Sequence, residues 1–301
     1  MNKKAFILLL LVFYILSKSL LLNKYGIITK DGVIYACLSE RFLDQGPSGL
    51  LDVTFPPLYP FSAGIGAFLL KPLYQFFPQT GKYFNSFELG GILASSFFHI
   101  LLCLAVYRAG KKLYGFNVAA WASLFMLFHP LLFRFSGEVL TETIFAFLIF
   151  CGSYLMFLKD EPSFFSTFSS ASCFGLSYYV KPEGIVVGIL FFIVLVFQKK
   201  GFREKPLKPF LFLISLAMLS APYVIYLSKE TGQVLLSNKQ NIVFYLSVKR
   251  MFPEMQSLEP TGVIAFVTAH PLHALVKLFR GLYYTVWNLP EAFFRIYFLF
   301  F

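Results

Sequence analysis

Long apolar runs alternate with short polar loops along the chain. Each run is continuous over roughly 20 residues rather than alternating between apolar and polar positions, so it predicts a helix long enough to cross a bilayer. The runs cover about residues 5–22, 86–107, 116–133, 139–157, 163–180, 184–198 and 207–227. The predicted fold class is therefore all-α: a polytopic integral membrane protein with about 7–8 transmembrane helices.

One apolar stretch, at residues 57–77, does not fit this description. Several prolines, which lack the backbone donor that a helix interior needs, interrupt it together with one lysine. These residues are Pro56, Pro57, Pro60, Lys71 and Pro72. We expect a pair of short interfacial or re-entrant helices here rather than a crossing, so that residues 23–85 form one large loop on the outer face.

The composition supports a membrane protein and argues against a nucleic-acid partner. Hydrophobic residues make up 57% of the chain, 40 residues are Phe, and the mean hydropathy is +0.70. A soluble domain of this length has too little interior to hide so much apolar surface. The net charge is +11, but the basic residues fall mainly in loops between the predicted spans, which is typical of a membrane-topology signal.

The basic loops also predict the orientation of the chain. Three clusters are rich in Lys and Arg: Lys3 and Lys4; Arg108, Lys111 and Lys112; and Lys199, Lys200, Arg203, Lys205 and Lys208. All three lie in the cytoplasm, as the positive-inside rule requires, only if residues 23–85 contain no crossing. We therefore expect a multi-pass protein of the inner (plasma) membrane of the cell, with a cytoplasmic N-terminus.

This topology places several ionisable residues together at the outer ends of the predicted helices. They are Asp31, Glu138, Glu142, Lys181, Glu183 and Lys239. Ionisable groups are costly at such places, so they are candidates for a functional site on the outer face. Each also has a purely structural explanation, as a helix cap, as a partner of a helix dipole or as part of a solvated turn.

Asp31 stands near the start of a short predicted helix in the outer loop. Apolar residues at helical spacing follow it, and Gly46 and Pro47 end the pattern. Asp31 therefore lies at the N-cap or in the first turn of this helix, where an aspartate is favourable.

Two further patterns concern the later acids and a lysine. Glu138 and Glu142 are four residues apart, which places them on the same face of the span that they begin. Lys181 precedes Pro182 in a turn between two spans. Its ammonium group, if desolvated there, needs an anionic partner, either Glu183 or a lipid phosphate.

No pattern in the sequence supports a metal site or a cofactor. The cysteines and histidines lack the spacing of metal ligands. The chain contains no phosphate-binding glycine loop and no nucleotide-binding fingerprint. We expect no resident cofactor, and the involvement of a divalent metal in the reaction stays open.

Five elements of this chain follow one another in a recognisable order. They are Asp31 after the first span, Phe55-Pro56-Pro57-Leu58-Tyr59-Pro60, Leu140-Thr141-Glu142-Thr143-Ile144-Phe145, Lys181-Pro182-Glu183-Gly184, and the segment from Tyr223 to Lys239. This order, over about residues 5–240, resembles the GT-C superfamily of membrane glycosyltransferases. The resemblance is specifically to bacterial relatives of the dolichyl-phosphate-mannose–protein mannosyltransferases and of the aminoarabinose transferase of lipid A.

The resemblance implies transfer of a sugar from a polyprenyl-phosphate donor to an acceptor hydroxyl of a cell-envelope lipid, polysaccharide or protein. The family's first-loop acid corresponds to Asp31, its fourth-span acid to Glu142, and its Arg-Pro-Glu-like turn to residues 181–183. The chain departs from the family at two positions. Gly32 stands where many relatives carry a second acid, and Lys181 replaces the more frequent arginine, which loses the two-pronged contact with phosphate.

The chemistry of such a transfer suggests a role for each candidate. Asp31 would accept the proton of the acceptor hydroxyl as general base, and Glu142 is the second candidate for a catalytic carboxylate. A cation would stabilise the leaving phosphate, and the interfacial apolar stretch would receive the isoprenoid tail. The candidates for substrate binding are Lys181, Glu183, Lys239, Glu138, Arg134 and Tyr59.

Two other classes of protein fit parts of the pattern. A transporter or lipid flippase would carry its charges near mid-span, whereas the acids here lie at span ends, and a non-catalytic membrane scaffold would need none of them. We expect residues 1–227 to form the catalytic membrane module and residues 228–301 an outer-face segment with a partial hydrophobic helix. Because that helix is still apolar at Phe301, the sequence suggests that the natural chain continues.

Overall fold

The computed structural model describes Val12, Tyr14 and Ile15 and residues 28–76, 85–157, 163–197, 207–255, 257 and 263–298. Every regular element in these ranges is a helix, which confirms the predicted all-α class. The predicted first span lies outside the described residues except for Val12, Tyr14 and Ile15. The chain divides into two compact units, Met1–Asp52 with Pro56–Ser220 and Val53–Phe55 with Ala221–Phe301.

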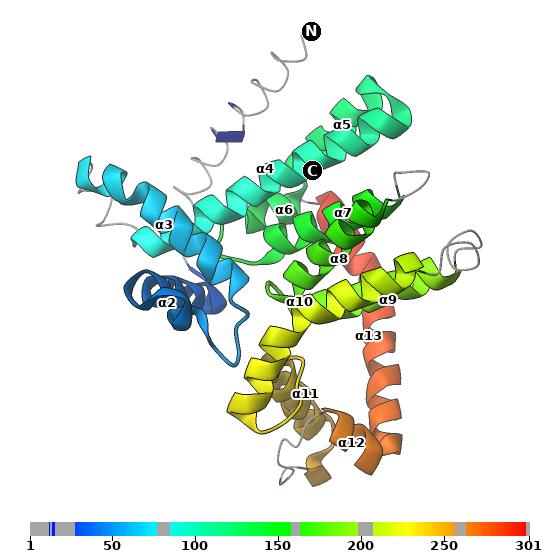
Figure 1. Ribbon diagram of the computed structural model, residues 1–301. Helices are drawn as coiled ribbons and strands as arrows, with labels where there is room; N and C mark the ends of the chain where they lie inside the picture. The colour runs from blue at the N-terminus through cyan, green and yellow to red at the C-terminus, as the bar shows by residue number, and fades with distance from the viewer. Residues whose placement is uncertain are drawn as a thin grey trace. The chain divides into compact units, whose positions relative to one another are not determined.

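Unit 1 contains most of the helices (Figure 1). They are α2 (Lys30–Gln45), the 3-10 helix η1 (Gly46–Leu50), α3 (Leu58–Phe76), α4 (Ser86–Tyr114), α5 (Phe116–Leu127), α6 (Pro130–Phe135), α7 (Glu142–Phe157), α8 (Phe164–Tyr178), α9 (Glu183–Phe197) and the first part of α10 (Leu207–Thr231). Among the described helices, α4 and α10 are long and apolar enough to cross a membrane, and α5, α7 and α9 are shorter apolar helices. The predicted number of 7–8 crossings stays a prediction.

The predicted span at residues 116–133 is not one continuous helix. Helix α5 ends at Leu127, and α6 begins at Pro130. His129 has a ψ angle of 118°, outside the helical range, because the ring of a following proline clashes with a helical residue. The apolar run is therefore helical but broken in two.

The prolines around residues 57–77 interrupt the helix less than expected. The expected pair of short helices is wrong, since α3 runs as a single helix of 19 residues with Pro72 inside it. Pro56 and Pro57 precede the helix, and Pro60 lies in its first turn, where a missing backbone N–H breaks no intrahelical bond. Whether α3 lies in the interface stays a prediction.

Helix α3 crosses close to the first half of α4 (Figure 1). The two backbones approach one another at Gly66 of α3 and Gly90 of α4. A Cβ atom at Gly66 would clash with the Gly90 carbonyl group, and a Cβ atom at Gly90 would clash with the backbone of Ala67 and Ala63. Small residues allow such close packing, which is a main source of helix association in lipid.

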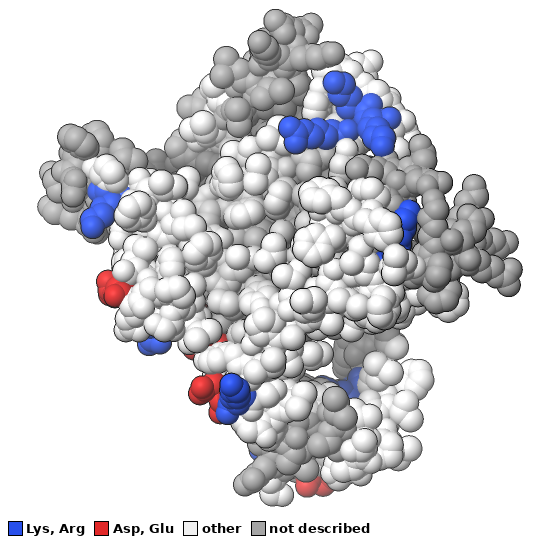
Figure 2. Space-filling view, in the orientation of Figure 1, with Lys and Arg blue, Asp and Glu red and all other residues white. Residues whose placement is uncertain are grey.

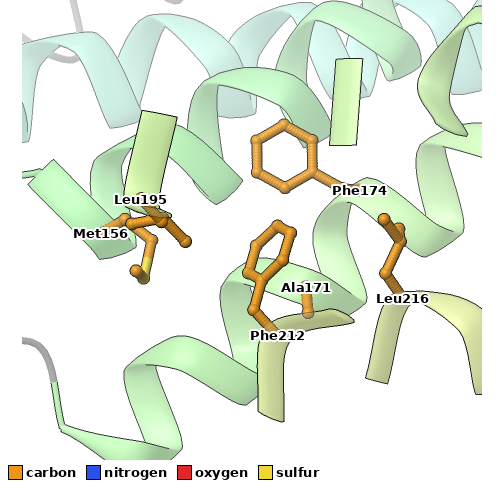
Figure 3. Packing of buried hydrophobic residues seen from close by; sticks show 6 residues of the cluster. All are labelled: Met156, Ala171, Phe174, Leu195, Phe212 and Leu216. Carbon is orange, nitrogen blue, oxygen red and sulfur yellow. The ribbon is translucent and has the colours of Figure 1, made fainter. Parts of the chain in front are cut away.

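The four helices α7 to α10 share an apolar core within unit 1 (Figure 3). Its buried members are Met156, Ala171, Phe174, Leu195, Phe212 and Leu216. The ring of Phe174, which is fully buried, lies 5.9 Å from the ring of Phe212 in an edge-to-face arrangement that aromatic pairs favour. This core fixes α8 and α9 on either side of the turn that carries Lys181.

Unit 2 is also helical. It contains the end of α10, α11 (Asn238–Met251), the 3-10 helix η3 (Pro253–Met255), α12 (Val263–Ala269) and α13 (Pro271–Phe298). Its core consists of Tyr245, Val248, Met255 and Phe266. The hydrophobic helix expected near the end of the sequence is part of α13, which has 28 residues.

We predict that Gly90→Ala destabilises unit 1. The added methyl group meets backbone atoms of α3 that cannot rotate away, so α3 and α4 must separate at a cost of about 1–3 kcal/mol. The measurement is the thermal unfolding midpoint of the purified protein in detergent, which falls by a few degrees. Gly281→Ala in α13 is the control, because nothing lies within 4 Å of a Cβ atom there. Equal midpoints for Gly90→Ala and the wild type would contradict this packing.

Candidate active site

Two serines of α4 hold the segment that leads into α7. Ser96 Oγ donates a hydrogen bond to the carbonyl oxygen of Ser136 at 2.7 Å. Ser95 Oγ donates to the carbonyl oxygen of Leu140 at 3.0 Å. Because a buried backbone acceptor needs a donor, these bonds fix the start of α7 against α4.

Helix α2 lies against the segment before α7, and the turn between α8 and α9 lies against the start of α3. A Cβ atom at Gly32 of α2 would be 3.1 Å from the carbonyl oxygen of Val139, so α2 touches the segment before α7. The backbone N–H of Leu58, at the start of α3, donates to the carbonyl oxygen of Tyr179 at 2.9 Å. Helix α2 therefore lies against the segment that leads into α7, and the start of α3 lies against the end of α8.

Asp31 is not the N-cap of α2. Thr29 takes that position, and its side chain accepts a hydrogen bond from the backbone N–H of Gly32 at 3.1 Å. Asp31 lies in the first turn and is partly exposed. Capping therefore does not require Asp31, although its charge is favourable at this end of the helix.

Glu142 and Lys181 form an ion pair that joins the start of α7 to the α8–α9 turn. The Lys181 Nζ atom donates to Glu142 Oε1 at 2.8 Å, and the side chains of Lys181 and Glu142 are 30% and 28% exposed. Glu142, and not the expected Glu183, is thus the protein partner of this lysine. The other carboxylate oxygen, Glu142 Oε2, is buried and accepts no hydrogen bond in the part of the chain that the structure describes. A buried carboxylate oxygen without a donor is unfavourable, so this atom can accept a further hydrogen bond.

Tyr35 is a site residue that the sequence patterns did not single out. It is 5% exposed, and burial raises the pKa of its hydroxyl well above the usual value. The charges of Asp31, Glu142 and Glu183 raise this pKa further, while a hydrogen bond with the Thr141 side chain acts in the opposite direction. The phenol therefore stays protonated in the shared field of three carboxylates. The sequence could have identified Tyr35 as a site residue from its position four residues after Asp31, on the same helix face.

Tyr59 contributes to the site from inside the protein. It has no exposed surface, and its ring lies 4.9 Å from the ring of Tyr35. Its hydroxyl donates to the carbonyl oxygen of Gly91 at 3.1 Å and lies 2.9 Å from Ser95 Oγ. Tyr59 therefore packs against Tyr35 on the side that faces the protein interior. Direct substrate binding by Tyr59 stays a prediction.

Arg134 and Glu138 pair with one another. The Arg134 Nε atom donates to Glu138 Oε1 at 2.9 Å, with Arg134 67% exposed. The prediction that Glu138 shares a helix face with Glu142 is wrong, because α7 begins only at Glu142. The Leu140 N–H donates to the Glu138 carbonyl oxygen at 3.0 Å, which closes a turn ahead of the helix.

The last two predicted site residues lie in different surroundings. Glu183 begins α9 and is exposed. Lys239 belongs to unit 2, where its Nζ atom lies 4.6 Å from the centre of the Phe55 ring. Its relation to the residues of unit 1 stays a prediction. In the described ranges, no group of three or more His, Cys, Asp or Glu residues is placed to hold a metal ion.

Comparison with known proteins gave one family. The family model described as dolichyl-phosphate-mannose-protein mannosyltransferase matches residues 72–226, a range that contains Glu142 and the turn with Lys181. No curated protein and no solved structure matched the chain.

We predict that Tyr59→Phe lowers the stability of the protein by about 1–3 kcal/mol, because the buried hydrogen bonds of the Tyr59 hydroxyl with the Gly91 carbonyl oxygen and with Ser95 Oγ are then lost. The measurement is thermal unfolding in detergent. Tyr114→Phe is the matched control, since Tyr114 is 70% exposed. Unchanged stability of Tyr59→Phe together with weaker substrate binding would instead support direct binding by this hydroxyl.

Proposed function

We infer the function of this protein from one premise: the chain belongs to the dolichyl-phosphate-mannose-protein mannosyltransferase family, whose model matches just over half of it. Membership makes it a membrane glycosyltransferase of the GT-C superfamily. It also favours this class over the transporter, flippase and scaffold alternatives. We propose further that the donor is a polyprenyl-phosphate sugar, that the acceptor is a hydroxyl group, and that the reaction takes place on the outer face of the membrane.

The observation that carries the proposal is the half-buried ion pair with one unused carboxylate oxygen. Glu142 Oε2 lacks a hydrogen-bond donor within the described part of the chain, and a sugar hydroxyl would supply one. An ammonium group has three N–H donors, so Lys181 can bind a phosphate oxygen while it keeps its bond to Glu142 Oε1. The pair can therefore hold the sugar and the phosphate of one donor molecule at the same time.

The proposed reaction is a single displacement at the anomeric carbon. The acceptor oxygen forms a bond to this carbon while its proton passes to the Asp31 carboxylate. The bond between the anomeric carbon and the phosphate oxygen breaks, and polyprenyl phosphate leaves with the electron pair. Lys181 stabilises the charge of the leaving phosphate, and the configuration at the anomeric carbon inverts.

Gly32 supports the proposal that one acid of the first loop is sufficient here. A Cβ atom at this position would be 2.9 Å from the Thr29 side chain as well as close to Val139. A larger side chain at this position would therefore require the Thr29 side chain and the Val139 backbone to shift. Where relatives carry a second acid, this chain has a glycine, and the glycine allows α2 to pack closely against Val139. This packing holds the adjacent Asp31 near the site.

We predict that Asp31→Asn abolishes sugar transfer without unfolding the protein. Loss of a general base typically lowers the rate by about 10² to 10⁴, and the Thr29 cap is unaffected. The measurement is mass spectrometry of polyprenyl-phosphate sugars and envelope glycans in cells that carry each variant, with thermal stability measured in parallel. Asp44→Asn, an exposed acid at the other end of α2, is the control with the same charge change. Transfer by Asp31→Asn above about a tenth of the wild-type rate would exclude Asp31 as the base.

We predict that Lys181→Ala weakens the binding of a short-chain polyprenyl phosphate far more than Lys181→Arg does. Losing a hydrogen bond to a charged group corresponds to about 10- to 100-fold in affinity. The binding constant in detergent micelles is the readout, and Lys71→Ala on α3 is the control for charge alone.

A double variant separates the phosphate contact from the ion pair. Lys181→Ala leaves the half-buried Glu142 charge uncompensated, and Glu142→Gln removes that charge. If Lys181 only neutralises Glu142, the variant with both changes binds polyprenyl phosphate as the wild type does. If Lys181 holds the phosphate, binding stays weak in the double variant.

A further inference from the structure

A cavity of about 540 Å³ lies at the far end of α4 from the candidate active site, against α7. Its lining residues are Leu104, Tyr107, Arg108, Lys111, Lys112 and Tyr154. Figure 2 shows a group of Lys and Arg side chains on the surface over this end of α4. The volume falls within the range of small-ligand pockets, about 300–1,000 Å³.

The lining of this cavity selects for an anion. Arg108 is three residues before Lys111 and four before Lys112, so the three cations share one face of α4 and repel one another. Tyr107 and Tyr154 are half-buried and each adds a hydroxyl that can donate a hydrogen bond. The lining contains no carboxylate. An arginine, two ammonium groups and two phenols are a set of donors that suits a phosphate group.

The position of the cavity indicates that this phosphate belongs to a lipid. Helix α4 is long and apolar enough to cross a membrane. The distance along α4 from Gly91, beside Tyr59, to Arg108 is about 25 Å at 1.5 Å per residue, close to the thickness of the hydrocarbon core. Leu104, one turn before Arg108, is exposed. The cations therefore lie where an apolar helix surface ends, at the depth of lipid headgroups.

The neighbouring surface offers room for the acyl chains of such a lipid. Trp121 and Phe125 on α5 are 61% and 72% exposed, and α5 packs beside α4, as the contact between Gly110 and Ala119 shows. Large exposed apolar side chains on a helix that packs against the basic end of α4 fit a molecule with a charged head and apolar tails. Basic pockets between membrane helices are known to bind anionic lipid headgroups.

We propose that this cavity binds the phosphodiester headgroup of an anionic glycerophospholipid. Arg108 forms two parallel hydrogen bonds with the phosphate, and Lys111 and Lys112 add positive charge. The hydroxyls of Tyr107 and Tyr154 donate to the remaining headgroup oxygens. The site lies at the opposite end of α4 from Glu142 and Lys181, and it takes part in no step of the proposed sugar transfer.

The basic residues also have a simpler role, since the predicted orientation of the chain uses them as a cytoplasmic signal. A pure topology signal depends on charge alone and does not involve the tyrosine hydroxyls or the shape of the guanidinium group. Variants that keep the charge therefore separate the two roles. Arg108→Lys retains the charge but loses the two-pronged contact, and Tyr154→Phe changes no charge.

The experiment measures lipid binding to the full-length protein by native mass spectrometry, with phosphatidylglycerol as probe and phosphatidylcholine as the neutral reference. We expect Arg108→Lys to weaken phosphatidylglycerol binding about tenfold or more and Tyr154→Phe to weaken it about 2- to 10-fold. Lys208→Gln, which removes a cation of another basic cluster outside the cavity lining, should leave it within about twofold. Labelling of the exposed Cys37 reports whether each variant folds and inserts as the wild type does.

Three results would overturn the proposal. The first is equal phosphatidylglycerol binding by the wild type, Arg108→Lys and Tyr154→Phe. The second is a loss in Lys208→Gln as large as in Arg108→Lys, which would show attraction by overall charge. The third is displacement of the lipid by inorganic phosphate at matched concentration, which would assign the cavity to a free anion. Loss of binding in the cavity variants with unchanged sugar transfer would support a lipid site that is separate from the active site.

Discussion

The close approach of helix backbones at small residues is the constraint on which the arrangement of unit 1 depends. In lipid, apolar side chains gain little by touching one another rather than acyl chains, so helices associate through tight packing and hydrogen bonds. Gly66 and Gly90 bring α3 onto α4, and Gly32 brings α2 onto the segment before α7. Because Asp31 adjoins Gly32, the contact that packs α2 also brings the candidate base to the site.

The charges of the site follow from this packing. Asp31, Glu142 and Glu183 all act on the buried Tyr35 hydroxyl, and Lys181 pairs with one of these acids. Three carboxylates close together would repel one another, and their mutual repulsion falls when a cation or a hydrogen-bond donor lies between them. The protonated phenol of Tyr35, which is hydrogen-bonded to the Thr141 side chain, adds no further charge to this group. The result is a half-buried site that is rich in acceptors, which suits a substrate that brings many hydroxyl groups.

The sequence predicted the helices well where periodicity and length agree, and less well where single side chains decide the geometry. The apolar runs that became α7, α8 and α9 were located to within three residues at each end, whereas α4 begins where predicted but extends seven residues beyond the predicted end. The break before Pro130 depends on where that proline falls relative to a helix start, and α3 stays continuous even with Pro72 inside it. Hydropathy reports neither feature. Asp31 and Thr29 are both good caps, so only the structure could assign the N-cap to Thr29.

The pairing of charges was harder to predict than their presence. The topology argument placed Lys181 and Glu142 on one side of the membrane, but Glu183 is the nearer acid in the sequence. The backbone turns sharply at residues 181–184, with the Gly184 N–H donating to the Lys181 carbonyl oxygen at 2.9 Å. Lys181 pairs with Glu142 of α7, while Glu183 is left exposed at the start of α9. Sequence distance is a poor guide when a turn separates two side chains that are only two residues apart.

The two ends of α4 carry opposite charges. Glu88 lies in its first turn and Lys111 and Lys112 in its last turn, an arrangement that complements the helix dipole at both ends. The same basic end is one of the clusters from which the orientation of the chain is predicted, and it lines a cavity with two tyrosines. These three effects do not compete, because a helix C-terminus, a cytoplasmic membrane surface and an anionic headgroup all favour cations at one place. Charge alone explains the first two, whereas the phenol donors beside the cations are needed only for the third.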